Sequence, residues 1–171
     1  MSVLRFRALL ALIVAALASS FALASWAEHR AGDDVVLTVR NLSGVMHVYS
    51  RSDLAKMRRV TFSTTTIWTE GKHEFSGVPL SDVLKVSGVE IGVVDLYAAN
   101  DYVATVPLDE ITPDVPIVAD LFDGQPMSLR DKGPLWVVYP YDSDRAYQSE
   151  TTYTRSVWQL VRIEAVPATG D

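Results

Sequence analysis

The chain has no cysteine among its 171 residues. Disulfide bonds are therefore excluded, and so is any chemistry that needs a thiolate as a nucleophile or as a metal ligand. Histidine is scarce as well, because His29, His47 and His73 stand in separate segments. None of them has the H-E-x-x-H or H-x-x-E-H spacing of zinc enzymes. The sequence therefore predicts no metal site of its own.

Several catalytic and nucleotide-binding motifs are also missing. The chain contains no G-x-S-x-G nucleophile turn, no P-loop and no G-x-G-x-x-G fingerprint. Positive charge is in deficit, with 15 basic residues against 21 acidic ones. Such a balance repels nucleic acid and anionic lipid, so we expect neither as a partner.

Long apolar runs are absent except near the N-terminus. Arg5 and Arg7 precede the apolar run at 8–18, and Ala22-Leu23-Ala24 has the small-residue pattern of a signal cleavage site. We therefore expect residues 1–24 to be a Sec-type signal peptide, residues 25–171 to form a single domain, and the mature protein to be periplasmic or secreted, without a membrane span. A cut after Ala27 is an alternative. An uncleaved anchor is another, although the run is short for a span of about 20 residues.

Two short helices are predicted. The stretch "GVPLSDVLKVSG" at 77–88 has apolar residues at i, i+3 and i+4 from Leu80, with Pro79 near the start and Gly88 just past the end. A second helix is expected at 52–57, with Ser52 as its N-cap. Both are short compared with the rest of the chain, so helices contribute little to the expected fold.

Alternating apolar residues and frequent turn signals indicate that strands dominate. Turns are expected at Asn100-Asp101 and at Asp123-Gly124. Strands are expected at 35–42, 60–68, 93–99, 102–108, 116–122, 125–129, 134–140 and 156–166. Because the strands are separated mostly by turns, the predicted class is α+β, a mixed β-rich fold.

One long connection, "YDSDRAYQSETTYTR" at 141–155, has no clean period. A loop of this length in a compact domain is usually functional or mobile. Tyrosine and arginine are enriched at binding hot spots, so Tyr141, Tyr147, Tyr153 and Arg145 are candidate partner-binding residues. The alternative is that one or two of these tyrosines pack into the core.

The order of four segments carries a family resemblance. "EFSGVPLSDVL", "NDYVATVPLDEI", "LFDGQPMSLRDKGPLWVVYPYD" and "SVWQLVRIE" follow one another over nearly the whole chain from Val35 to Val166. In this order they resemble the molybdopterin-binding domain of the sulfite oxidase superfamily. The resemblance implies a sulfite-oxidase-like fold and, for the family, a molybdopterin-dependent oxidoreductase.

The resemblance also implies where a cofactor would lie. The family's single cysteine ligand for molybdenum falls within 63–66, which reads Ser-Thr-Thr-Thr here. A neutral hydroxyl is a far weaker ligand for this metal than a thiolate. The family's pterin phosphate would fall near Arg155 and Ser156, and Thr64 and Thr65 could bond a ligand in a vestigial pocket. A solvated arginine and a half-exposed strand are the structural alternatives.

Two functions are therefore expected, in order. The first is an exported, cofactor-free binding or sensory module whose partner is an unknown periplasmic protein or small ligand. This agrees with the interrupted pair Arg5-Phe6-Arg7, because folded, cofactor-loaded exports use a twin-arginine signal. The alternative is an oxidoreductase that keeps molybdopterin without a protein thiolate. A structural protein without a ligand is a third class.

Overall fold

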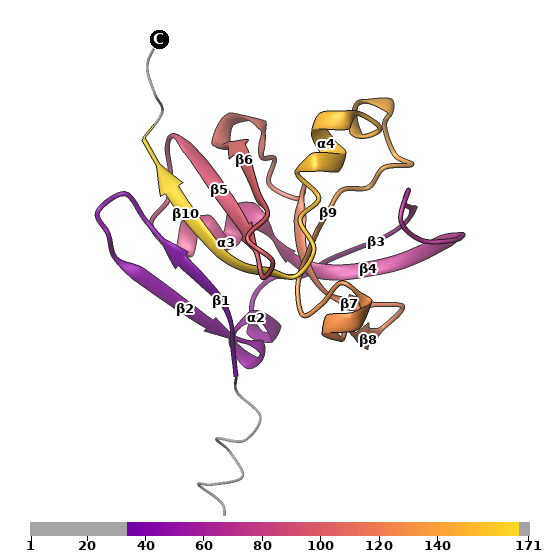
Figure 1. Cartoon of the computed structure of the whole chain (residues 1–171), viewed down its shortest axis with the longest axis horizontal. Helices are drawn as coiled ribbons and strands as arrows, with labels where there is room; N and C mark the ends of the chain where they lie inside the picture. The colour runs from indigo at the N-terminus through magenta and orange to yellow at the C-terminus, as the bar shows by residue number, and fades with distance from the viewer. Residues whose placement is uncertain (1–33, 168–171) are drawn as a thin grey trace, which may run out of the picture. The chain divides into compact units, whose positions relative to one another are not determined.

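Two β-sheets form the part of the chain that the structure describes, residues 34–167 of a computed structural model (Figure 1). The first sheet has the order β2-β1-β10-β5-β6. Its strands are β1 (Val35–Arg40), β2 (Met46–Ser50), β5 (Val93–Ala98), β6 (Val103–Pro107) and β10 (Leu160–Val166). β1 and β10 are parallel, whereas the other pairs of this sheet are antiparallel.

The second sheet is antiparallel throughout and has the order β3-β4-β7-β8, with β9 pairing to β7. Its strands are β3 (Val60–Thr65), β4 (Lys72–Pro79), β7 (Ile117–Phe122), β8 (Gln125–Pro126) and β9 (Trp136–Val138). Where β4 pairs with β7, at a register shift between Ser76 and Gly77, a Cβ on Gly77 would lie 2.2 Å from the carbonyl oxygen of Val118. Only glycine permits this close approach.

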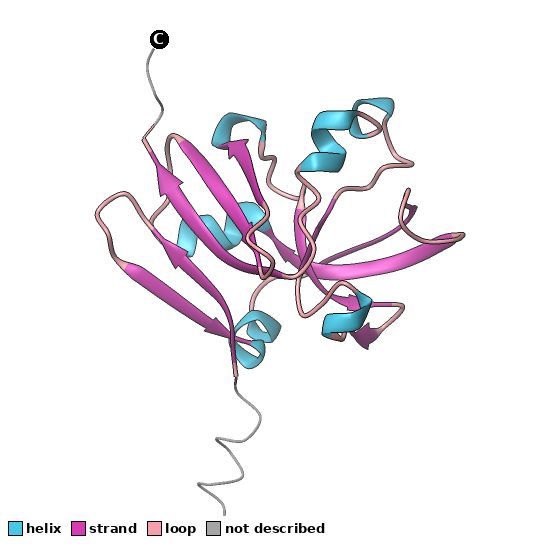
Figure 2. Cartoon of the chain, in the orientation of Figure 1, coloured by secondary structure: helices cyan, strands magenta, loops and turns pink. Residues whose placement is uncertain are grey.

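Helices are few and short (Figure 2). They are α2 (Arg51–Lys56), α3 (Leu80–Val86) and α4 (Glu150–Thr154), with single 3₁₀ turns η1 (Leu108–Glu110), η2 (Leu129–Asp131) and η3 (Arg145–Tyr147). The described region is therefore a mixed β-rich fold with few helices, as the sequence predicts. The expected signal peptide at 1–24 lies outside the described residues.

The strongest helix prediction is confirmed, and the weaker one is shifted. In α3 the residues Leu80, Val83 and Leu84 are buried, and Gly88 follows with a positive φ of 70°. For α2 the predicted N-cap, Ser52, is wrong, because Ser50 caps the helix. The Ser50 hydroxyl accepts from the Asp53 amide at 3.2 Å, and the Asp53 carboxylate accepts from the Ser50 amide at 3.1 Å.

Several predicted strands are too long, and those at 125–129 and 134–140 shorten to β8 and β9. The strand expected at 60–68 ends at Thr65, because the Thr66 hydroxyl accepts from the Trp68 amide at 3.1 Å and turns the chain. The strand expected from 156 starts at Leu160, after Gln159 adopts a left-handed φ of 52°. The connection at 141–155 is more regular than predicted, since it contains η3 and α4.

The core contains large side chains from both sheets and from α3. Phe75 on β4, Trp136 on β9 and Leu160 on β10 are fully buried, and the rings of Phe75 and Trp136 meet edge to face at 5.4 Å. Within residues 34–167, no helix is long and apolar enough to cross a membrane. The turns that carry the candidate site connect the strands of these two packed sheets.

Candidate functional site

Trp68, in the turn between β3 and β4, is the centre of an aromatic cluster. Its ring meets those of four other residues edge to face, at centroid distances of 5.6 to 6.2 Å: Trp136, Tyr141, Tyr153 and Trp158. Edge-to-face pairs add to the stability gained by burial alone. The cluster therefore fixes the β3–β4 turn against α4 and the start of β10.

One side of this cluster is open and lines a cavity of about 530 Å³, which we call the aromatic pocket. Its described lining comes from the β3–β4 turn, the β5–β6 turn and the segment from α4 to β10: Ile67, Trp68, Ala98, Asn100, Tyr102, Glu150, Tyr153, Thr154, Ser156, Val157 and Trp158. Ligand pockets for small molecules have volumes of roughly 300 to 1,000 Å³ and mostly apolar walls. The aromatic pocket meets both conditions.

The polar groups at the aromatic pocket are few. The Tyr102 hydroxyl donates to the carbonyl oxygen of Thr154 at 2.7 Å, which holds the β5–β6 turn against the end of α4. Among the described residues that line the pocket, Glu150 is the only charged one. The pocket can therefore bury an apolar or aromatic group beside a single carboxylate.

A smaller cavity of about 240 Å³, which we call the threonine pocket, shares Ile67 and Tyr153 with the aromatic pocket. Thr65, Thr66 and Asp142 also line it. The Asp142 carboxylate accepts from the Thr65 hydroxyl at 2.6 Å and from its amide at 2.9 Å. These two bonds lower the pKa of Asp142 below its ordinary value, and the bond from the Thr65 hydroxyl has the larger effect. The carboxylate is therefore held as an anion.

The residues predicted to hold a pterin phosphate have protein partners instead. The Arg155 guanidinium donates to the Glu110 carboxylate at 2.5 Å and to the Thr105 carbonyl oxygen at 3.2 Å. The Arg155 bond lowers the pKa of Glu110. Ser156 is buried and donates to the Thr152 carbonyl oxygen at 2.7 Å. Arg155 is thus a structural tie between η1, β6 and the end of α4.

Thr64 and Thr65 are likewise engaged, in this case with the chain after β9. Thr64 is fully buried, and its hydroxyl accepts from the Asp142 amide at 3.1 Å and donates to the Thr65 carbonyl oxygen at 3.2 Å. Both threonines therefore anchor the 141–155 connection to β3. Thr65 also lines the threonine pocket, whereas Thr64 does not.

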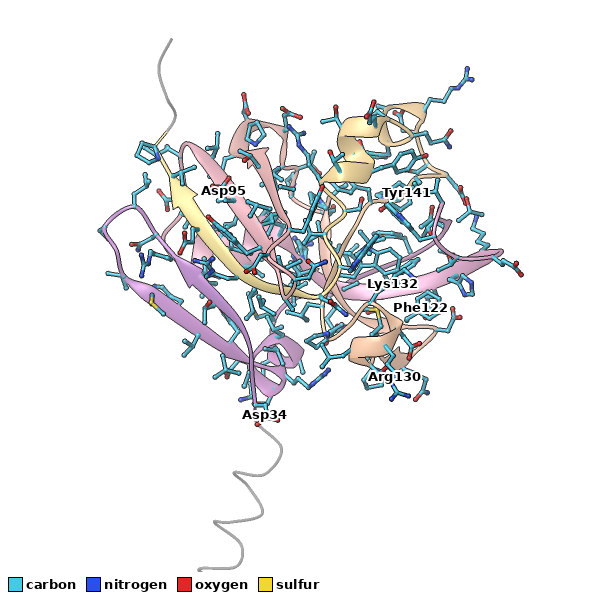
Figure 3. The ribbon with its side chains drawn as sticks, in the orientation of Figure 1. Asp34, Asp95, Phe122, Arg130, Lys132 and Tyr141 are labelled. Atoms are coloured by element: carbon cyan, nitrogen blue, oxygen red, sulfur yellow. The ribbon has the colours of Figure 1, made fainter. Side chains whose placement is uncertain are left out.

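The four predicted partner-binding residues separate into two kinds. Tyr141 is only 2% exposed, and its hydroxyl donates to the Ser156 hydroxyl at 2.7 Å. Burial raises its pKa to about 12. Tyr141, labelled in Figure 3, is therefore a core residue, the alternative that the sequence left open, because it is buried and its ring packs against that of Trp68. Tyr147 and Tyr153 are half-buried, and Arg145 is exposed.

Sequence reasoning missed most of the pocket. Of the predicted site residues, Tyr153 and Ser156 line the aromatic pocket, whereas the sequence predicts only strands at Trp68, Trp158 and Tyr102. No local pattern marks them, because the three rings come from segments far apart in the chain. The available signal was the tryptophan content: three of the four tryptophans, Trp68, Trp136 and Trp158, belong to one aromatic cluster.

The residues present do not fit a thiolate-held molybdenum cofactor. The chain has no cysteine, and the hydroxyl of Thr64, in the expected ligand segment, is already bonded within the protein. Over residues 34–167 there is no group of three or more His, Asp or Glu side chains placed to hold a metal ion. Neither the ligand segment nor Arg155 therefore offers the donors that the family resemblance implies.

Comparison with known proteins relates the chain to others through its fold. No protein-family model matches the sequence, and no curated protein is similar to it. The fold is similar to that of a dehydrogenase of known structure. Because the sequence identity is low, this similarity shows the fold alone. One such solved structure is the sulfane dehydrogenase SoxCD from Paracoccus pantotrophus, with a TM-score of 0.60 and 19% sequence identity. The match covers 78% of this chain and 38% of that chain.

Proposed function

We propose that the domain is an exported binding or sensory module of sulfite-oxidase-like fold that works without a cofactor and takes a small ligand in the aromatic pocket. The observation that carries the proposal is the lining of that pocket. Four aromatic rings and Ile67 surround about 530 Å³, with one charged residue at the wall. An apolar concave site with few polar groups is the usual form of a small-molecule site.

The position of the aromatic pocket supports this function further. Three of the lining residues belong to α4, within the 141–155 connection expected to be functional: Glu150, Tyr153 and Thr154. The ring of Trp68 is held by four neighbours, so a ligand would meet a surface that is ordered before it binds. Such preorganisation reduces the entropic cost of binding.

Export is part of the same proposal. It is supported by the charged, apolar and small-residue sequence at 1–24. A chain exported unfolded by a Sec-type signal would fold outside the cytoplasm, where a cofactor inserted during cytoplasmic folding is not supplied. The absence of cysteine from the sequence agrees with this route, because no thiolate then has to receive a metal.

The fold likeness to SoxCD, a dehydrogenase, favours a second candidate. This is a molybdopterin-dependent oxidoreductase that retains its cofactor without a protein thiolate. Metal analysis of the protein purified from the exported fraction of its own host separates the two. Stoichiometric molybdenum would favour the oxidoreductase over the binding module.

Binding of a neutral probe, 3-tert-butylphenol, tests the pocket directly. Ile67 is 61% exposed and lines the aromatic pocket, whereas Ile91 is 72% exposed and lines none of the cavities described. We expect saturable one-to-one binding by calorimetry, weakened about tenfold by Ile67→Ser, because apolar contact area is lost. Ile91→Ser is the matched control and should leave the affinity unchanged. Absence of saturable binding to the unmodified protein would overturn the proposal.

A further inference from the structure

The charge at the aromatic pocket is of one sign. Glu150 is the only charged residue among the described residues that line it. Within residues 34–167, the Glu150 carboxylate also makes no hydrogen bond or ion pair with another group. Two other acidic groups are engaged by the protein: Glu110 pairs with Arg155, and Asp142 is bonded to Thr65 and lies 3.6 Å from the Lys72 ammonium.

The aromatic rings favour the same sign of ligand charge. The ring of Trp68 is nearly perpendicular to those of Trp158 and Tyr153, at 81° and 87°. The rings that line the pocket therefore do not lie in parallel planes. The face of an aromatic ring is its negative side and attracts a cation, most strongly a weakly hydrated alkylammonium group.

We propose that the ligand of the aromatic pocket is a small organic cation, an alkylammonium or a quaternary arylammonium, whose charge is held by Glu150 and by the rings of Tyr102, Trp68 and Trp158. This inference rests on the proposed function, since it specifies the ligand class of the same pocket. The cation is desolvated against the rings, and its positive charge is balanced by one carboxylate. The overall charge of −6 also favours the approach of a cation to the protein.

A set of three probes of one shape tests the sign of the charge. They are 3-hydroxyphenyltrimethylammonium, its neutral isostere 3-tert-butylphenol, and the anion 3-hydroxybenzenesulfonate. Competition with 3-tert-butylphenol confines the comparison to a single pocket. We expect the cation to bind about tenfold more tightly than the neutral isostere, and the anion to bind least.

Two pairs of variants connect the preference to named groups. Glu150→Gln should remove most of the advantage of the cation over 3-tert-butylphenol, and Glu150→Lys should reverse the order of cation and anion. Glu90→Gln is the matched control, because Glu90 is exposed and lines none of the cavities described. Tyr102→Leu should weaken the cation selectively, and Tyr102→Phe, which keeps the ring, should restore it.

The outcomes distinguish this inference from the function on which it rests. If the neutral and cationic probes bind equally, or if Glu150→Gln affects both to the same extent, the cation inference is overturned while the binding pocket stands. If none of the three probes binds, the proposed function is overturned together with it. A cation preference that survives both Glu150→Gln and Tyr102→Leu would overturn the assignment to this pocket.

Discussion

The indole ring of Trp68 lies 5.6 Å from that of Trp158, with the two planes at 81°, although the residues are 90 positions apart in the chain. Trp68 belongs to the β3–β4 turn of one sheet, and Trp158 precedes β10 of the other. Their contact ties the two sheets together at the aromatic pocket. The pocket therefore depends on the long-range packing of the domain and cannot form from either segment alone.

Core truncation should be costly at two positions. Trp136 and Leu84 are 1% and 2% exposed. We expect Trp136→Ala and Leu84→Ala each to lower the free energy of unfolding by about 2 to 5 kcal/mol, because each leaves a cavity in a packed interior. Val86→Ala, on an exposed face of α3, is the control and should stay within about 0.5 kcal/mol. Denaturant unfolding measures all three, and a near-neutral Leu84→Ala would contradict the packing of α3.

α3 and most strands could be predicted because their signals are local. Pro79 and Gly88 bracket one apolar face of a helix, and alternation marks the strands. The cap of α2 was wrong although its signal was also local: Ser50 has an acidic residue three positions later, as a capping box requires, and Ser52 does not. The end of β3 at Thr65 and the start of β10 after Gln159 are set by turn geometry. The alternation of apolar residues does not indicate that geometry.

The candidate site could be predicted only in part, for a different reason. Tyr153 and Ser156 were selected from the 141–155 connection and from the family resemblance, and both line the pocket. Trp68 and Tyr102 join them only through the packing of separate sheets. Whether a side chain such as Tyr141 serves the core or the surface is decided by that packing, so its residue type alone could not settle it.

Two tyrosine hydroxyls make hydrogen bonds of the same length in different surroundings. Tyr141 donates to the Ser156 hydroxyl and Tyr102 to the Thr154 carbonyl oxygen, each at 2.7 Å, but only Tyr141 is buried. We expect Tyr141→Phe to cost about 1 kcal/mol of unfolding free energy, since water cannot replace the lost donor. Tyr102→Phe should cost less than about 0.5 kcal/mol. Equal losses from the two variants would show that burial does not set the cost.

The 141–155 connection allows stability and binding to be separated. Arg145 is exposed, so Arg145→Ala should change the unfolding free energy by no more than about 0.5 kcal/mol. Tyr147 is half-buried, with its ring 5.9 Å from that of Tyr139, so Tyr147→Ala should cost more, about 1 to 2 kcal/mol. Neither residue lines the aromatic pocket, so neither change should weaken 3-tert-butylphenol in calorimetry. A selective loss of probe affinity in Arg145→Ala would contradict this placement.

The pair of Arg155 and Glu110 should contribute to acid sensitivity. The hydrogen bond from Arg155 lowers the pKa of Glu110 in the folded state. A lowered carboxyl pKa gives stability that is present above the unfolded value and is lost as pH falls through the folded value. Glu110→Gln should therefore flatten the decline of unfolding free energy in acid. Denaturant midpoints measured over a range of acidic pH check this. If the midpoint falls as steeply in Glu110→Gln as in the unmodified protein, the pair does not contribute to acid sensitivity.

The pair of His73 and Asp123 should stabilise the fold most at mildly acidic pH. Its contribution should be smaller at higher and at lower pH. The Nδ1 atom of His73 lies 2.7 Å from the Asp123 carboxylate, and its Nε2 atom lies 2.7 Å from the Glu70 carbonyl oxygen. Both partners only accept, so the charged imidazole, which donates from both ring nitrogens, is favoured over the neutral one. The hydrogen bond to Asp123 is the main cause that raises the pKa of His73 above its ordinary 6.5. The pKa of Asp123 is lowered below its ordinary 3.8. The main cause is the hydrogen bond from the Glu74 amide, and the second is the hydrogen bond from His73.

The raised pKa of His73 and the lowered pKa of Asp123 make stability depend on pH in opposite directions. A double-mutant cycle measures the coupling between the two residues. The His73 contribution is complete below its unfolded pKa and is lost as pH rises through the raised folded value. The Asp123 contribution is complete above its unfolded pKa and is lost as pH falls through the lowered folded value. The coupling between His73→Gln and Asp123→Asn, taken from unfolding free energies of both single variants and the double variant, should therefore be largest at mildly acidic pH. It should decline toward alkaline and strongly acidic pH. A coupling that is constant across this range would mean that the imidazole is not held as a cation by Asp123.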